Sequence, residues 1–192
     1  MSEKQKMLNG EIYNAYDEKL ILLRNVARHL TKNYNNTDPE ATEQRIAILK
    51  KLFGKIGNDF EIEPPFYCDY GTNMEIGEKF YANFNFVVLD DGLVKIGDDV
   101  LIGPNVSIFT ATHLIDPNLR PKNADYTKSV TIGNNVWIGG GCIINPGVSI
   151  GDNSVIGSGS VVTKNIPANV VAAGNPCKII KCIEKNNKSV FN

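Results

Sequence analysis

The sequence predicts a mainly β protein that winds as a parallel β-helix of six-residue repeats, with an N-terminal helical cap and one excursion loop. Two observations carry this prediction. From Ile96 onward an aliphatic residue returns at every sixth position, and the frame resumes at Ile132 after one interruption. Helical spacing of apolar residues is confined to the part of the chain before about residue 53. The 192 residues suffice for one domain with an appendage.

The first part of the chain, residues 1–56, is assigned to the helical cap. An apolar stripe at helical spacing is formed by Leu20, Leu23, Ala27 and Leu30. A second helix is expected to start within Thr37-Asp38-Pro39-Glu40, where Thr or Asp would cap it and Pro would occupy its first turn. Tyr13, Tyr16 and Asp17 are expected at the surface of this cap.

Residues 57–192 are assigned to the β-helix, including a C-terminal tail. Each repeat offers an aliphatic residue, usually a glycine, two polar residues and a small or β-branched one. Three repeats form one triangular coil, so each face is a short parallel strand and the inward side chains stack into ladders. Cys142 occupies a small-residue position and is expected inside. The Asp90-Asp91-Gly92 turn carries two extra residues and predicts a local bulge.

Composition and charge exclude several classes of function. A net charge of -1 gives no electrostatic case for nucleic acid as a partner. The N-terminus lacks the apolar core of a signal peptide, and no stretch approaches a membrane span, which predicts a cytoplasmic protein that binds no membrane. The four cysteines show no metal-type spacing and are expected to be reduced, structural thiols.

The repeat is interrupted between Ile108 and Val130, which predicts a projecting loop over residues 113–129. His113, one of two histidines, stands where the chain leaves the coil. A neutral imidazole there could take a proton from a hydroxyl, and the Gly139–Gly141 run could offer a backbone amide to an oxyanion. On these grounds alone, a catalytic role and a structural role for His113 are about equally supported.

Longer stretches of the sequence carry a family resemblance. They are residues 79–85 (KFYANFN), 110–117 (TATHLIDP), 132–140 (IGNNVWIGG), 144–148 (INPGV) and 170–176 (VVAAGNP). With them the chain resembles, from about Met7 to Ile183, the maltose/galactoside O-acetyltransferases of the hexapeptide-repeat acyltransferase superfamily. The resemblance implies a left-handed coil, a homotrimer with active sites between neighbours, acetyl-CoA as co-substrate, no metal, and acetyl transfer to a hydroxyl of maltose, glucose or a galactoside.

The resemblance also implies roles for individual residues. His113 matches the catalytic general base. Positions at the sugar acceptor are matched by Asp17, Asp69, Asn83 and Asp91, although the register at Asp17 is loose. Positions that contact coenzyme A are matched by Asn83, Gly140, Ser158, Thr163, Lys164, Lys178 and Lys181. Asp69 follows the maltose branch, whereas the galactoside branch has serine there. Gly140 replaces a serine of the galactoside branch, so only its backbone amide can serve.

Three alternatives remain beside sugar acetylation. The same chemistry could act on an antibiotic or another small hydroxyl compound. A carbonic-anhydrase-like β-helix would need a cluster of zinc-binding imidazoles, which two histidines disfavour. A non-catalytic β-helix scaffold would bind no coenzyme A, and it gives the His113 excursion no purpose.

Overall fold

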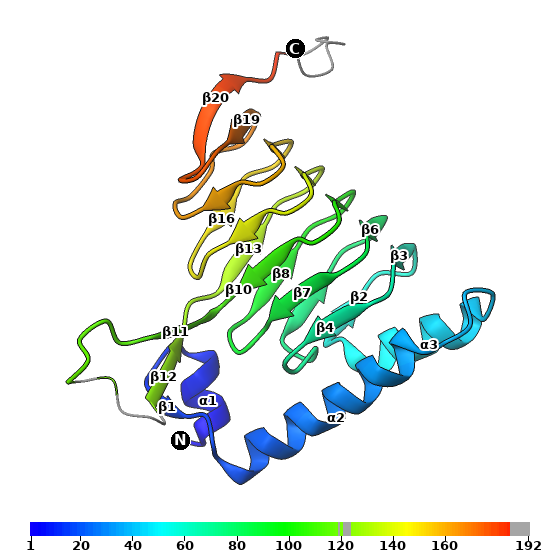
Figure 1. Cartoon of the computed structure of the whole chain (residues 1–192), viewed down its shortest axis with the longest axis vertical. Helices are drawn as coiled ribbons and strands as arrows, with labels where there is room; N and C mark the ends of the chain where they lie inside the picture. The colour runs from blue at the N-terminus through cyan, green and yellow to red at the C-terminus, as the bar shows by residue number, and fades with distance from the viewer. Residues whose placement is uncertain (119, 121–123, 185–192) are drawn as a thin grey trace.

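The computed structural model describes residues 1–118, 120 and 124–184 and shows a triangular prism of short parallel strands (Figure 1). The first face contains β2 (Lys55–Ile56), β5 (Met74–Ile76), β8 (Val94–Ile96), β13 (Val130–Ile132) and β16 (Ser149–Ile150). The second face contains β3 (Phe60–Ile62), β6 (Phe80–Ala82), β9 (Leu101–Ile102), β14 (Trp137–Ile138), β17 (Val155–Ile156), β19 (Val170–Ala173) and β20 (Lys178–Cys182). The third face contains β4 (Phe66–Cys68), β7 (Phe86–Leu89), β10 (Ser107–Phe109), β15 (Ile143–Ile144) and β18 (Val161–Val162).

The predicted ladders form the core of the prism. On the second face, strand pairing aligns Ala82, Ile102, Ile138, Ile156 and Ala172. All five are buried, as is Cys142. Each buried valine or isoleucine contributes roughly 1.5–3 kcal/mol through loss of apolar surface to water. The six-residue period therefore sets which residues stack in successive coils.

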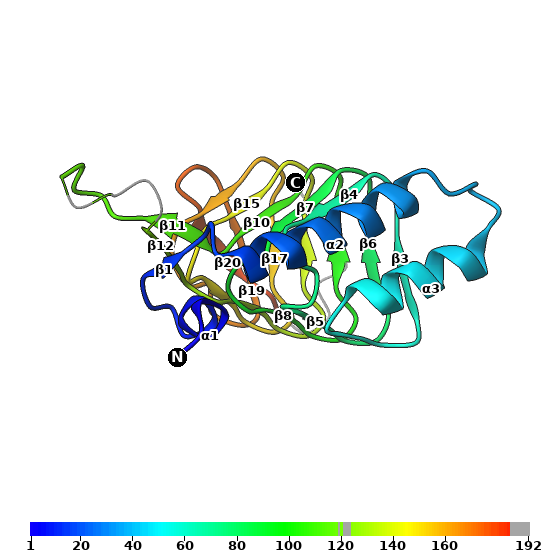
Figure 2. The ribbon, with the colours of Figure 1, turned by 90° about the horizontal axis from the view of Figure 1, so that it is seen from below.

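The cap lies across the N-terminal end of the prism, as Figures 1 and 2 show. It consists of α1 (Glu3–Leu8), β1 (Tyr13–Asn14), α2 (Glu18–Asn35) and α3 (Thr42–Leu52). The predicted stripe of α2 faces inward, with Leu20 and Ala27 buried. The expected start of the second helix was wrong. The Asp38 carboxylate accepts the Glu40 amide in a turn instead, and α3 begins at Thr42.

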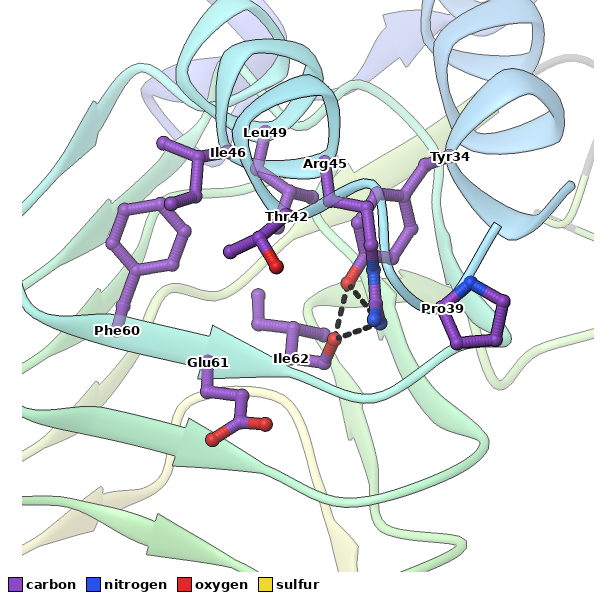
Figure 3. Close-up of a pocket in the computed structure, with 9 residues that line it drawn as sticks. All are labelled: Tyr34, Pro39, Thr42, Arg45, Ile46, Leu49, Phe60, Glu61 and Ile62. Carbon is purple, nitrogen blue, oxygen red and sulfur yellow. Dashed lines mark hydrogen bonds between the residues drawn. The ribbon is translucent and has the colours of Figure 1, made fainter. Parts of the chain in front are cut away.

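A cavity of about 350 Å³ lies between α3 and β3 (Figure 3). At its edge the Arg45 guanidinium donates to the Tyr34 hydroxyl oxygen and to the Ile62 carbonyl oxygen, both at 3.3 Å. The Tyr34 hydroxyl donates to the same carbonyl. These bonds fasten both long helices to the first coil, on the side of the molecule away from the excursion loop (Figure 1).

The excursion forms a small antiparallel sheet with the N-terminal segment. Its strands are β11 (Ala111–His113) and β12 (Ala124–Thr127), and β1 pairs with the outer edge of β12. Tyr13 lies on β1 and is buried, contrary to the surface position expected for it, because its hydroxyl donates to the Asp91 carboxylate. Tyr16 is 62% exposed, as expected.

The far end of the prism is closed by β20, which folds back antiparallel to β19. Cys68, Cys142 and Cys177 are buried, Cys182 is exposed, and all four are unpaired thiols. Among the described residues, no helix has both the length and the apolarity needed to cross a bilayer.

Candidate active site

Two corners of the prism collect the residues predicted for the site. The acidic corner, where the third face passes to the first, holds Asp69, Asp90 and Asp91 and the start of the His113 excursion. The glycine corner, where the second face passes to the third, holds Asn83, Gly103, Gly139, Gly140 and Ser158.

The catalytic candidate His113 is paired with a carboxylate. The register of β11 and β12 places His113 opposite Asp125, and 2.5 Å separates His113 Nδ1 from Asp125 Oδ1. A neutral imidazole that donates from Nδ1 keeps Nε2 as a proton acceptor. The His113 side chain is 64% exposed, so a ligand can reach that nitrogen.

Asp125 was missed by the sequence analysis. It lies within the interrupted segment, where no six-residue frame assigns positions. The only local signal is that Asp125-Tyr126-Thr127 and Ala111-Thr112-His113 could each form a short strand. Their antiparallel pairing, which the structure supplies, brings the carboxylate to the imidazole.

Two predicted acceptor residues, Asp69 and Asp91, hydrogen-bond to each other in the acidic corner. Burial raises the pKa of Asp91 to about 6, with further repulsion from Asp69, while the Tyr13 hydroxyl at 2.9 Å opposes the rise. Burial also raises the pKa of Asp69, opposed by its bond to Asp91 and by the charges of Arg24 and Arg28. The pair therefore holds a proton more readily than two isolated, exposed carboxyl groups would.

Asp90 lies beside this pair and is fully buried. Its Oδ1 accepts the backbone N–H groups of Asp69 at 3.0 Å and Tyr70 at 2.8 Å. Its Oδ2 is buried and has no hydrogen-bond partner within the described chain. Burial raises the pKa of Asp90 to about 8, so the group is held as a neutral acid over most of the physiological range.

The raised pKa of Asp90 predicts how the free energy of unfolding depends on pH. An acid whose pKa is raised by folding, from about 3.9 in the unfolded chain, binds more protons when folded, so the free energy of unfolding falls as pH rises. The pKa of Asp90 is about 8 and that of Asp91 is about 6. The fall caused by Asp90 therefore continues to about pH 8, whereas the fall caused by Asp91 ends near pH 6. We expect Asp90→Asn to remove the fall between about pH 6 and pH 8, measured by urea unfolding at a series of pH values. Equal slopes in wild type and variant would contradict a neutral Asp90.

Asp17 occupies a different kind of position. It is the N-cap of α2, where its Oδ1 accepts the backbone N–H groups of Lys19 and Leu20 at 3.1 and 3.2 Å. Helix capping alone is sufficient to explain why an aspartate occupies this position. A role at the acceptor for Asp17 stays a prediction.

Successive coils pack too closely at the glycine corner to leave room for side chains at Gly103 and Gly139. A Cβ on Gly103 would lie 2.5 Å from the Gly140 nitrogen, and one on Gly139 would lie 2.6 Å from the Ser158 nitrogen. The amides of Gly139 and Gly141 donate to the carbonyls of Ile156 and Pro104, both at 2.8 Å. Within the described chain the Gly140 amide makes no such bond. Of the predicted glycine run, this amide is therefore the one left for a ligand oxygen.

The remaining predicted coenzyme A residues divide between the corners. Lys178 pairs with Ala173, and Ala173 lies next to Gly157 of the preceding coil, at the glycine corner. Lys181 lies farther along the exposed strand β20. Thr163 and Lys164 follow β18 and are exposed at the acidic corner. The third face separates the two corners. From Pro104, which contacts Gly140, to Thr110 it spans up to about 20 Å at roughly 3.3 Å per residue.

Comparisons with known proteins match both parts of the chain. A model described as the maltose acetyltransferase hexapeptide capping motif matches residues 6–57, and one described as bacterial transferase hexapeptide (six repeats) matches residues 129–164. The galactoside O-acetyltransferase of Escherichia coli K12 is 44% identical over 191 residues, covering 100% of this chain and 94% of that protein. The chain belongs to the maltose/galactoside O-acetyltransferase family.

Solved structures agree with this assignment. A maltose O-acetyltransferase from Clostridium difficile 630 superposes with a TM-score of 0.95 at 51% identity, covering 96% of this chain and 99% of that one. A galactoside acetyltransferase in complex with coenzyme A also gives a TM-score of 0.95, at 44% identity and with 100% and 96% coverage. The predicted family and fold class, a hexapeptide-repeat β-helix with a helical cap, are confirmed for this acetyltransferase family member.

Proposed function

We propose that this protein transfers the acetyl group of acetyl-CoA to a hydroxyl of a sugar, with His113 as general base. The observation that supports the proposal is the His113–Asp125 pair, which joins β11 to β12 with the His113 side chain exposed, beside the buried carboxyls of the acidic corner. A structure of a 44% identical relative that holds coenzyme A supports the choice of co-substrate.

Each residue has a defined task in this proposal. Acetyl-CoA supplies an acyl group activated as a thioester. A sugar hydroxyl is too weak an acid to attack unaided, so His113 Nε2 takes its proton during attack, and Asp125 holds the tautomer and stabilises the positive imidazolium. The Gly140 N–H donates to the acyl oxygen as negative charge gathers there. When the tetrahedral intermediate collapses, the C–S bond breaks and the imidazolium gives its proton to the departing coenzyme A thiolate, so no acetylated enzyme residue is required.

The residues present also fit coenzyme A. The Gly140 amide makes no backbone hydrogen bond within the described chain, so it can donate to the ligand. Exposed ammonium groups, which suit phosphates, are supplied by Lys164, Lys178 and Lys181.

We extend the proposal to a homotrimer in which the glycine corner of one protomer meets the acidic corner of the next. Within one chain, a whole face of the prism separates Gly140 from the His113 excursion, which is too far for both to act on one acetyl group. A neighbouring copy solves this geometric problem, because a head-to-tail contact repeated around a threefold axis brings unlike corners together.

The outward side chains support the same assembly. On the second face they are Glu61, Tyr81, Leu101, Trp137 and Val155, and on the third they are Tyr67, Val87, Ser107, Ile143 and Val161. On the first face they are Lys55, Glu75, Lys95, Thr131 and Ser149. Leu101 is 50% and Trp137 44% exposed in the single chain. The two mainly apolar faces meet at the glycine corner, which favours that corner as a contact with another copy.

The acceptor is proposed to be glucose or maltose in preference to simple galactosides. Asp69 can accept hydrogen bonds from two sugar hydroxyls at once, and a site that bonds a hydroxyl discriminates against sugars that leave its groups unpaired. We expect Asp69→Ser to narrow the ratio of kcat/KM values for maltose and methyl galactoside, measured by thiol release from acetyl-CoA. A wild-type preference for galactosides would contradict the maltose-type assignment, and activity on an antibiotic alone would favour the alternative acceptor.

The proposed location is the cytoplasm. Cells hold acetyl-CoA there, and the four unpaired cysteines suit a reducing compartment.

A further inference from the structure

We infer that Asp90 is a positioning residue for the acceptor site: its Oδ1 fixes the Asp69–Tyr70 backbone and thereby aims the Asp69 carboxyl at the acceptor. The inference rests on the proposed acceptor role of Asp69. It assigns Asp90 no contact with the substrate.

Asp90 can fix the Asp69–Tyr70 backbone because Asp90 is itself held in place by its neighbours. The Asn73 side-chain amide donates to the Asp90 carbonyl at 2.7 Å, and the Thr110 hydroxyl oxygen accepts the Gly92 amide at 2.8 Å. The bulged turn is therefore anchored on both sides by buried groups. From this turn the Asp90 carboxyl reaches across to the neighbouring coil and binds two successive amides there.

Those two amides belong to the residues that shape the acidic corner. Asp69 carries the carboxyl that bonds Asp91, and the Tyr70 hydroxyl oxygen accepts a hydrogen bond from Arg24 at 2.6 Å. Without an acceptor for both N–H groups, two buried or partly buried donors would be left unsatisfied. The Asp69–Tyr70 segment would then turn to satisfy them elsewhere, and Asp69 would lose its direction.

Asp90 serves as a hydrogen-bond acceptor and not as a charge. Its Oδ2 is buried and has no hydrogen-bond partner among the residues that the structure describes, and the guanidinium of Arg24 donates to the Tyr70 hydroxyl and the Ala15 carbonyl instead. A charged carboxylate here would also repel Asp69 and Asp91. An uncharged side chain of the same shape, asparagine, can therefore replace Asp90 with its Oδ1 function intact.

Three variants test the inference by steady-state kinetics with maltose and acetyl-CoA. Asp90→Ala should raise the KM for maltose by about tenfold or more, as expected for unsatisfied donors, with the KM for acetyl-CoA within about twofold of wild type. Asp90→Asn should restore the KM for maltose to within about threefold. Ser154→Ala is the matched control, because the Ser154 side chain is equally buried and also hydrogen-bonds backbone groups, those of Asp152, Pro167 and Val170, but lies outside the acidic corner.

Amide hydrogen exchange tests the same inference without any acceptor. Asp90→Ala should speed exchange at Asp69 and Tyr70, whereas Asp90→Asn should not. If Asp90→Ala does not fold, Asn73→Ala takes its place, because it frees the Asp90 carbonyl from its anchor and should raise exchange at the same two amides.

The outcomes separate this inference from the proposed function. Unchanged exchange at Asp69 and Tyr70 in the alanine variant overturns it, whatever the enzyme acetylates. So does an asparagine variant as impaired as the alanine one, or a Ser154→Ala variant with the same rise in KM for maltose. A wild-type enzyme that acetylates no sugar overturns the proposed function instead, and the exchange result then decides the positioning role.

Discussion

Replacing His113 by alanine is expected to lower turnover by roughly two to four orders of magnitude, the range for loss of a general base. Without the imidazole, no group held by Asp125 can take the proton of the attacking hydroxyl. The fold should survive, because the His113 side chain is 64% exposed and its partner within the described chain is the Asp125 carboxylate. Affinity for coenzyme A should be nearly unchanged, because His113 is proposed to act on the acceptor hydroxyl and not to bind coenzyme A.

Turnover would be followed by thiol release and coenzyme A affinity by calorimetry. His29→Ala is the matched control, since His29 is the other histidine of the chain and is exposed on α2. Near-normal turnover in His113→Ala, or an equal loss in His29→Ala, would remove His113 from the mechanism.

Two inactive variants are expected to rescue each other when they share one trimer. His113→Ala disables the acidic corner, and Ser158→Trp fills the exposed glycine corner with a bulky ring. Co-expressed with different tags and purified over both, the variants form mixed trimers. Each such trimer contains one site whose two corners are both native, so about a third of wild-type activity should return.

The control pairs two variants of the same corner, His113→Ala and Asp125→Ala. The turnover of their mixed trimers should equal the mean turnover of the two single variants, because no site then has a native acidic corner. Sedimentation equilibrium checks that every preparation is trimeric. No rescue in a trimeric His113→Ala/Ser158→Trp mixture, or a fully active monomer, would contradict the shared site.

The repeat allowed most of the prism to be predicted, because a strict six-residue period also sets strand register. Gly140 and Ser158 are three six-residue repeats apart, so the period places them at one corner, whereas Asn83 precedes the interruption and joins them only through the strand pairing in the structure. The period also predicts that the Cys142 side chain points into the core, where it is buried. Local rules were weaker in the cap, where a turn around Asp38 delayed the start of α3.

The parts that escaped prediction depend on long-range pairing without a period. The bond from Tyr13 to Asp91 joins residues 78 positions apart, and neither residue belongs to the same pattern. Asp125 reaches His113 only through a hairpin within the interruption. Tyrosine and aspartate are often found at protein surfaces, so residue type alone does not predict that Tyr13 and Asp91 are buried.

The sheet that joins β1, β12 and β11 has a consequence for how the enzyme matures. Its outer strand comes from the start of the chain, and the Thr127 hydroxyl donates to the Met7 carbonyl across 120 positions of sequence. During synthesis the early segment must wait while several coils emerge and wind, since contacts of large sequence separation form late. The coil and the β11–β12 hairpin that pairs His113 with Asp125 can thus assemble locally, whereas the third strand of this sheet is added only when the two distant segments meet.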